Sequence, residues 1–146
     1  MTNRIKSLLL VGLQFLFILL LLIGTRFQNH MLLAFGFIIT AILVVLWAIV
    51  TMQKSKLRIL PEPSADATLI TNGPYHLIRH PMYTAILLGC AGLLISKFSW
   101  IRLVMAVTLA MVLIVKLIWE ERMLSQKFDG YKEYMKHTKR LLPFIF

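Results

Sequence analysis

Two long uncharged stretches dominate the first third of the chain. Residues 7–25 contain no charged side chain, and residues 31–53 are likewise uncharged and rich in Leu, Ile, Val and Phe. A helix needs about 20 predominantly apolar residues to cross a hydrocarbon layer of about 30 Å. Both stretches therefore predict transmembrane helices.

Two shorter apolar stretches follow in the second half. Residues 82–96 are uncharged and precede Lys97, whose long side chain can reach the membrane surface. Residues 101–119 are apolar except for Lys116. The four residues 97–100 between these stretches predict a tight hairpin, with Trp100 as an interfacial anchor. The pattern as a whole predicts an all-α integral membrane protein with about four transmembrane helices.

The composition agrees with this pattern. The 146 residues are 59% hydrophobic and 15% charged, whereas soluble domains carry about 25% charged residues. These values exclude a soluble globular domain and a disordered chain. The one cysteine, Cys90, excludes a disulfide-stabilised scaffold. The length is that of one domain, residues 1–146.

The basic residues predict the orientation in the membrane. The formal net charge is +10, and twelve basic residues lie on one side of the predicted helices: Arg4, Lys6, Lys54, Lys56, Arg58, Arg79, Arg122, Lys127, Lys132, Lys136, Lys139 and Arg140. The other side has Arg26, Lys97 and Arg102. Because cytoplasmic loops are enriched in Lys and Arg, both termini and the middle loop are predicted to be cytoplasmic. Contact with anionic lipid headgroups accounts for this charge, so no nucleic-acid partner is expected.

The N-terminus and the tail need separate interpretations. The first apolar run exceeds the usual signal-peptide core of about 7–15 residues and lacks a small-x-small cleavage site, which predicts a retained anchor. Residues 120–146 alternate charged and aromatic side chains. Apolar residues recur there at helical spacing, with a break at Asp129-Gly130, and predict an amphipathic helical tail on the membrane surface.

Residues 73–83 read GPYHLIRHPMY and gather polar and aromatic groups at the cytoplasmic edge of the third predicted helix. Pro81 suits the first turn of a helix and holds His80 in an extended conformation. The free N–H groups and the positive dipole end of that helix then predict a site for a carboxylate or phosphate, with Arg79 and His80 as further donors. An interfacial anchor of Arg, His and Tyr explains the same residues.

A second polar cluster, Glu120-Glu121-Arg122, ends the fourth predicted helix. Adjacent residues on a helix diverge by about 100°, so one glutamate is expected to face the bundle interior. The other would pair with Lys116 or Arg122, or meet solvent. Lys116, one turn inside an apolar span, needs a partner or a water-filled cavity unless its side chain reaches the membrane surface. No metal site is expected, because His76 and His80 lack a third ligand.

Together these clusters resemble the isoprenylcysteine carboxyl methyltransferase family, a group related to the membrane phospholipid methyltransferases. The resemblance rests on Gly73-Pro74-Tyr75, Arg79-His80-Pro81-Met82-Tyr83, Glu120-Glu121-Arg122, Phe128-Asp129-Gly130-Tyr131, Tyr134 and Leu141-Leu142-Pro143. It covers residues 60–146, and the order and spacing of the motifs make it more specific than any one of them.

The resemblance implies a membrane methyltransferase that uses S-adenosylmethionine and has no Rossmann domain. The cofactor would enter from the cytoplasm, and a lipid or isoprenoid-bearing acceptor from the bilayer. The residues carried over to the cofactor pocket are Tyr75, His80, Pro81, Tyr83 and Glu120 or Glu121. A glutamate would suit the cofactor ammonium, and tyrosine faces the sulfonium.

The acceptor remains open between two chemistries. A carboxylate, as in an isoprenylcysteine-like lipid, is already a nucleophile and needs an arginine to hold it, for which Arg79 and Arg122 are candidates. A phospholipid amine would need a base, for which His80 or a glutamate such as Glu121 would serve. An NADPH-dependent sterol-type reductase and a small non-enzymatic membrane protein are the further alternatives. A second copy of the chain, in a homo-oligomer, is a candidate source of additional pocket helices.

Overall fold

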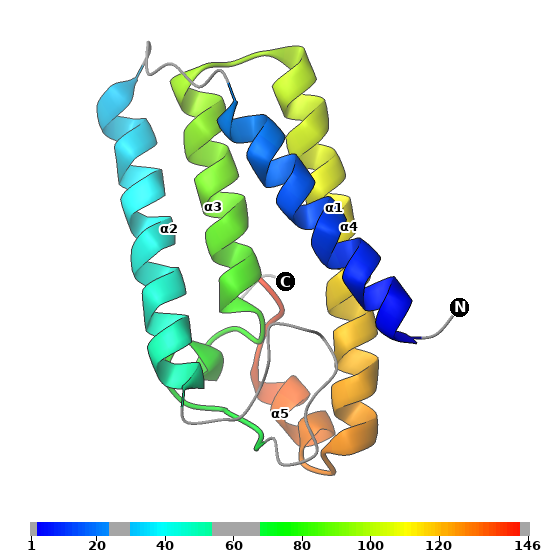
Figure 1. Ribbon diagram of the computed structural model, residues 1–146. Helices are drawn as coiled ribbons and strands as arrows, with labels where there is room; N and C mark the ends of the chain where they lie inside the picture. The colour runs from blue at the N-terminus through cyan, green and yellow to red at the C-terminus, as the bar shows by residue number, and fades with distance from the viewer. Residues whose placement is uncertain (1–2, 24–29, 54–67, 144–146) are drawn as a thin grey trace.

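A computed structural model describes residues 3–23, 30–53 and 68–143, with the side chains of residues 3 and 4 left out. These residues form five α-helices and one 3-10 turn: α1 (Asn3–Leu22), α2 (Met31–Met52), η1 (Gly73–His76), α3 (Pro81–Ser96), α4 (Trp100–Lys127) and α5 (Tyr131–His137). Figure 1 shows α1 to α4 side by side, with α5 below the end of the bundle where α2 ends and α3 begins. The all-α prediction is confirmed.

Three of these helices, α1, α2 and α4, contain stretches that are long and apolar enough to cross a membrane. Large apolar side chains such as Leu32 and Leu43 point outward from α2 and are exposed, as lipid-facing side chains would be. The fourth predicted span, α3, is a 16-residue helix and is shorter than the other three. The chain is therefore an all-α membrane protein, and a complete crossing by α3 stays a prediction.

Helices α2 and α3 pack closely because small residues line their contact. Ala34, Ala41 and Ala48 are buried and recur every seven residues along α2. An added Cβ on Gly92 of α3 would lie 2.9 Å from the Ala34 carbonyl oxygen, and one on Gly89 would lie 3.9 Å from the Ala41 Cβ. Small residues at these positions allow the two backbones to approach, as is common in membrane bundles.

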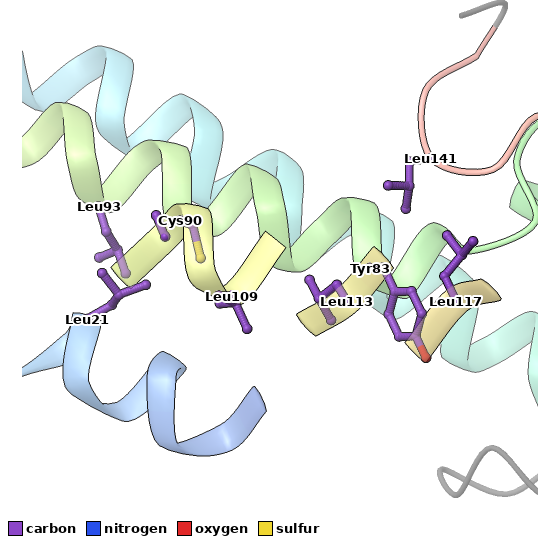
Figure 2. Close-up of a cluster of buried hydrophobic side chains, with 9 residues drawn as sticks. Leu21, Tyr83, Cys90, Leu93, Leu109, Leu113, Leu117 and Leu141 are labelled. Carbon is purple, nitrogen blue, oxygen red and sulfur yellow. The ribbon is translucent and has the colours of Figure 1, made fainter. Parts of the chain in front are cut away.

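Helix α1 packs against α4. Its buried residues Ser7, Gln14 and Leu21 also recur every seven residues, a spacing typical of helices that cross at a shallow angle. Leu109, Leu113 and Leu117 line the facing side of α4 and form a core with Tyr83, Cys90 and Leu93 of α3, Leu21 of α1 and Leu141 of the tail (Figure 2). Two of these buried positions on α1, Ser7 and Gln14, are polar.

Arg102 joins three helices at the end of the bundle opposite α5. It is buried in the first turn of α4 and donates to the carbonyl oxygens of Leu21 at 2.5 Å, Lys97 at 3.2 Å and Leu93 at 3.4 Å. These oxygens belong to the ends of α1 and α3, where intrahelical N–H donors become scarce, although the Leu93 oxygen also accepts the Lys97 N–H and the Ser96 hydroxyl. The guanidinium therefore satisfies the ends of two helices at once.

The tail differs from the prediction in where it begins. Helix α4 continues to Lys127, so residues 120–127 belong to the bundle helix and not to a separate surface segment. The break at Asp129-Gly130 is confirmed, since α5 begins at Tyr131. Glu121, buried against the segment before α3, keeps the last turns of α4 inside the fold.

Several predictions lie outside the described residues: the charges of Arg26, Lys54, Lys56 and Arg58 and most of the polar loop.

Candidate functional site

The candidate site begins where the chain enters α3. Pro81 is the first residue of that helix, as predicted. The carbonyl oxygen of His80 accepts the N–H groups of Tyr83 at 3.0 Å and Thr84 at 3.1 Å. His80 has φ −126° and ψ 61°, so the prediction of an extended backbone was wrong. Its N–H donates to the tail and its carbonyl oxygen accepts from the helix, so the backbone at His80 bends to make both sets of hydrogen bonds.

Those two hydrogen bonds also change the expected anion site. The N–H groups of Tyr83 and Thr84 are already taken by the His80 carbonyl oxygen, and Pro81 has no N–H. The start of α3 therefore offers fewer free donors than the sequence predicted.

The tail lies against this entry segment as a short parallel bridge between Ile78 and Lys139. The Arg79 N–H donates to the Lys139 carbonyl at 2.7 Å, and the His80 N–H donates to that of Arg140 at 3.0 Å. The Thr84 hydroxyl donates to the Leu141 carbonyl at 2.6 Å. Residues far apart in the sequence are thus fixed beside each other by backbone groups, which no periodicity in the sequence indicates.

Glu121 lies between two arginines. Arg79 Nε is 2.7 Å from Glu121 Oε1, and Arg140 Nε is 3.0 Å from Glu121 Oε2. The Arg79 and Glu121 side chains are both buried, whereas the Arg140 side chain is 34% exposed. Each carboxylate oxygen therefore has its own charged donor, which makes Glu121 a neutralised, structural anion.

The Nη1 group of Arg79 forms hydrogen bonds with the tail. It donates to the carbonyl oxygens of Thr138 and, at 3.2 Å, Met135, and contacts the Thr138 hydroxyl at 3.3 Å. Arg79 thus links α4 to the end of α5 through its Nε and Nη1 groups.

His80 lies between the two glutamates. Its Nδ1 is 3.5 Å from Glu120 Oε2 and its Nε2 is 3.6 Å from Glu121 Oε1. Its ring stacks on that of Tyr83, with centroids 5.2 Å apart and planes 6° apart. Within the described residues, Nε2 is buried and has no hydrogen-bond partner. A buried polar atom without a partner is costly, so this nitrogen is a candidate donor or acceptor for a ligand.

Lys116 lies behind Tyr83. Its side chain is buried, its Nζ donates to Gln14 Oε1 at 2.9 Å, and the same Nζ is 5.1 Å from the centroid of the Tyr83 ring. The hydrogen-bond partner of Lys116 is thus Gln14 of α1, and the charge of Glu120 also acts on the ammonium. Burial also excludes the alternative in which this lysine reaches the membrane surface.

Tyr75 of η1 is buried and lies close enough to Glu120 for that charge to act on it. Its hydroxyl is 3.9 Å from the Met52 sulfur, and its carbonyl oxygen accepts the Tyr134 hydroxyl at 2.5 Å. Burial, and then the negative charge of Glu120, raises the pKa of Tyr75 to about 12. Tyr75 is thus a neutral phenol at physiological pH.

The structure brings together most of the residues that the sequence singled out. Those gathered at this end of the bundle are Tyr75, Arg79, His80, Pro81, Tyr83, Glu120 and Glu121. Arg122 is exposed and takes no part in the contacts described for this cluster. The sequence did not point to Gln14, Thr138 or Arg140, because each reaches the site from a distant segment. In the described part of the chain, no group of three His, Cys, Asp or Glu side chains could hold a metal ion.

An apolar cavity of about 460 Å³ lies between α1, α2 and α3. Its walls are aliphatic side chains together with small residues and one thiol: Ile18, Leu21, Leu22, Ile38, Ala41, Ile42, Val45, Ala85, Ile86, Gly89, Cys90 and Leu93. It begins at Ala85, little more than one turn beyond His80 along α3. Its lining suits a hydrocarbon chain and offers no polar contact.

Two metal-resistance proteins resemble part of the chain. The cobalt-zinc-cadmium resistance protein CzcN of Cupriavidus metallidurans is 35% identical over 77 residues, which are 52% of this chain and 36% of that protein. The nickel-cobalt-cadmium resistance protein NccN of Alcaligenes xylosoxydans xylosoxydans is 28% identical over 76 residues, which are 51% of this chain and 36% of that protein. In these matches the chain spans about a third of the length of either relative.

A broader match covers most of the chain. Residues 29–130 match the family described as phospholipid methyltransferase. This range contains α2, η1, α3 and α4, and with them Arg79, His80, Tyr83 and both glutamates. It leaves out α1 and the tail, which contribute Gln14 and Arg140. The chain belongs to the phospholipid methyltransferase family of membrane methyltransferases.

Proposed function

We propose that this protein transfers a methyl group from S-adenosylmethionine to a lipophilic acceptor that reaches the site from the bilayer. The observation that carries this proposal is His80, buried between Glu120 and Glu121, whose Nε2 lies 3.6 Å from Glu121 and has no partner at hydrogen-bond distance among the described residues. Membership of a methyltransferase family supports the reaction class. The cluster lies at the bundle end where the basic segments gather, so we infer that the cofactor enters from the cytoplasm.

The residues present fit the amino-acid part of this cofactor. Glu120 is the better acceptor for its ammonium group, because Glu121 already binds Arg79 and Arg140. The Glu120 side chain is 15% exposed and has the His80 contact at 3.5 Å. His80 Nε2 is the donor we assign to the cofactor carboxylate, in place of the N–H groups that the start of α3 has already used. Tyr75 would close the pocket on its outer side.

The geometry leads us to a different role for Tyr83 from the sulfonium contact that the resemblance implies. Its ring already contacts His80 and the Lys116 ammonium. A second cation over the same ring would be repelled by the first. We therefore assign Tyr83 to positioning His80.

We infer that the acceptor is a carboxylate on a lipid, such as an isoprenylcysteine-like group. Arg79, Arg140 and Lys116 outnumber Glu120 and Glu121 at the site, so a third anion would balance the charge. Arg140 is the arginine we assign to hold this acceptor, because it is partly exposed while Arg79 is buried. The apolar cavity beside Ala85 would take the hydrocarbon part. A phospholipid amine, with His80 as the base, is the alternative acceptor.

In the reaction, S-adenosylmethionine supplies a methyl group on a positively charged sulfur. A carboxylate oxygen held by the protein would take that methyl group, and the electron pair of the broken carbon–sulfur bond would stay on sulfur. No proton has to move when the acceptor is a carboxylate. The protein therefore contributes position and exclusion of water. Glu120 and His80 would orient the donor, and Arg140 would orient the acceptor.

The test is thermal unfolding of the detergent-purified protein with S-adenosylhomocysteine, compared with NADPH. A ligand at a hundredfold excess over its Kd adds about 2.7 kcal/mol of stability, which raises the Tm visibly. We expect a rise with S-adenosylhomocysteine and none with NADPH. The reverse result would support the reductase alternative, and no response to either would support a non-enzymatic protein. Arg122→Ala, at an exposed position, is the control that should respond as the wild type does.

A further inference from the structure

Lys116 binds neither the methyl donor nor the acceptor in the reaction proposed above, although it is a buried cation inside a membrane-spanning helix. It lies in α4 and is 3% exposed. Ionisable residues inside membrane spans are costly, and they commonly mark functional positions. The question is what this lysine does for the site one turn away.

Its contacts connect α1 to the site. Lys116 Nζ donates to Gln14 Oε1 at 2.9 Å and lies 5.1 Å from the Tyr83 ring centroid. Tyr83 in turn stacks on His80, whose Nδ1 is 3.5 Å from Glu120. Gln14 is thus connected to Glu120 by four successive side-chain contacts, from a helix outside the residues that match the family.

Stability alone does not explain why a lysine is buried at position 116. The hydrogen-bond partner Gln14 is neutral, and the attraction of the ammonium to Glu120 is smaller than the cost of its burial. Replacing a buried ion pair by apolar side chains of similar volume is often neutral or stabilising, and we extend this to a buried cation whose hydrogen-bond partner is neutral. The ammonium over Tyr83 does have one local effect, because a cation over an aromatic face holds the ring in place.

We propose that Lys116, held by Gln14, is a positioning residue that fixes the Tyr83 and His80 rings for cofactor binding, and that it does so at a cost in stability. The inference rests on the proposed function, since it takes His80 and Glu120 as cofactor ligands. It assigns α1 a part in the site as well as in the bundle. It also separates two quantities that a purely structural lysine would change together.

The experiment measures Tm and S-adenosylhomocysteine affinity in the detergent-purified full chain. Lys116→Met removes the charge and keeps the length of the side chain. We expect its Tm to equal or exceed that of the wild type, and its affinity for S-adenosylhomocysteine to fall about tenfold. Lys116→Arg, which keeps a cation near Tyr83, should recover affinity to within about threefold. Lys132→Met, at an exposed position of α5, is the matched control and should change neither quantity.

The Tm of Gln14→Leu is a second test, which does not depend on the Lys116→Met variant alone. This substitution leaves the Lys116 ammonium without its acceptor and should lower the Tm, and the double variant Gln14→Leu/Lys116→Met should restore it. The inference is overturned if Lys116→Met binds S-adenosylhomocysteine as tightly as the wild type, or if Lys116→Met and Lys116→Arg lose affinity equally. A wild-type protein that does not bind S-adenosylhomocysteine would instead overturn the proposed function.

Discussion

Arg79 donates from Nε to Glu121 across 2.7 Å and joins the segment before α3 to the last turns of α4. The same guanidinium donates to the Thr138 carbonyl in the tail. The segment before α3, the end of α4 and the tail thus meet at one side chain. His80, the next residue, is placed between Glu120 and Glu121 as a consequence.

Loss of Arg79 should therefore loosen the tail. Arg79→Ala leaves Glu121 buried with Arg140 as its remaining charged partner, and breaking a buried ion pair costs about 3–5 kcal/mol. We expect a lower Tm and faster proteolytic cleavage within residues 128–143. Lys136→Ala is the control, because Lys136 pairs with Glu133 at an exposed position and such pairs contribute less than about 1 kcal/mol. Equal Tm values for the two variants would refute the role given to Arg79.

Arg102 should matter for stability and not for the cofactor. Arg102→Met removes the donor to the carbonyl oxygens that end α1 and α3. Hydrogen bonds to charged groups contribute about 1.5–3 kcal/mol each, so the free energy of unfolding should fall by at least that amount. Affinity for S-adenosylhomocysteine per folded molecule should not change, because Arg102 lies at the opposite end of the bundle. A variant that keeps its Tm would contradict this role.

The contact of α2 with α3 can be tested with a matched pair of glycines. A Cβ at Gly92 would lie 2.9 Å from the Ala34 backbone oxygen, which cannot move aside as a side chain can. We expect Gly92→Ala to cost about 1–3 kcal/mol. Gly89→Ala places its methyl 3.9 Å from Ala41 and should be neutral or stabilising, since alanine favours a helix over glycine by about 1 kcal/mol. If both variants unfold at the same Tm, the helices are not in this close contact.

Stability should fall in strongly alkaline solution. Burial raises the pKa of Tyr75 from 10.0 to about 12, and burial likewise raises the pKa of Tyr131 and of Tyr134. The folded protein holds these protons more tightly than the unfolded chain does. The stabilisation is therefore complete below pH 10 and is lost as the pH rises toward 12, with Tyr75 contributing about 2–3 kcal/mol.

The measurement for this prediction is the free energy of unfolding between pH 9 and about pH 12 for the wild type and Tyr75→Phe. The variant has no phenol to ionise at this position, so its curve should fall less steeply. Parallel curves would show that Tyr75 ionises equally in the folded and unfolded chain.

The sequence predicted the helices well because their signal is local. Uncharged runs, Pro81 and the hairpin at residues 97–100 place the four bundle helices to within a few residues, except at the end of α4. There the sequence changes from apolar to charged, and the helix nevertheless continues to Lys127. The last turns of α4 remain in the fold because Arg79 and Arg140 neutralise Glu121. Hydropathy along the chain cannot show that these distant arginines pair with Glu121.

The sequence predicted which residues form the candidate site, but it did not predict which of them contact one another. The motifs named His80, Tyr83 and the two glutamates, but left open which glutamate binds a ligand. The geometry assigns Glu121 to two arginines, which makes Glu120 the candidate. Gln14 and Arg140 could not be predicted, because their contacts depend on how α1 crosses α4 and how the tail folds back beside residues 78–80.

The central claim is that Glu120 beside His80 binds the cofactor, and calorimetric titration of S-adenosylhomocysteine into Glu120→Gln tests it most directly. This change removes the charge and keeps the shape, and Glu133→Gln is the matched control at an exposed position. We expect Glu120→Gln to lose about tenfold or more in affinity, as for a charge-assisted hydrogen bond, with an unliganded Tm close to that of the wild type. Wild-type affinity in Glu120→Gln would contradict the account.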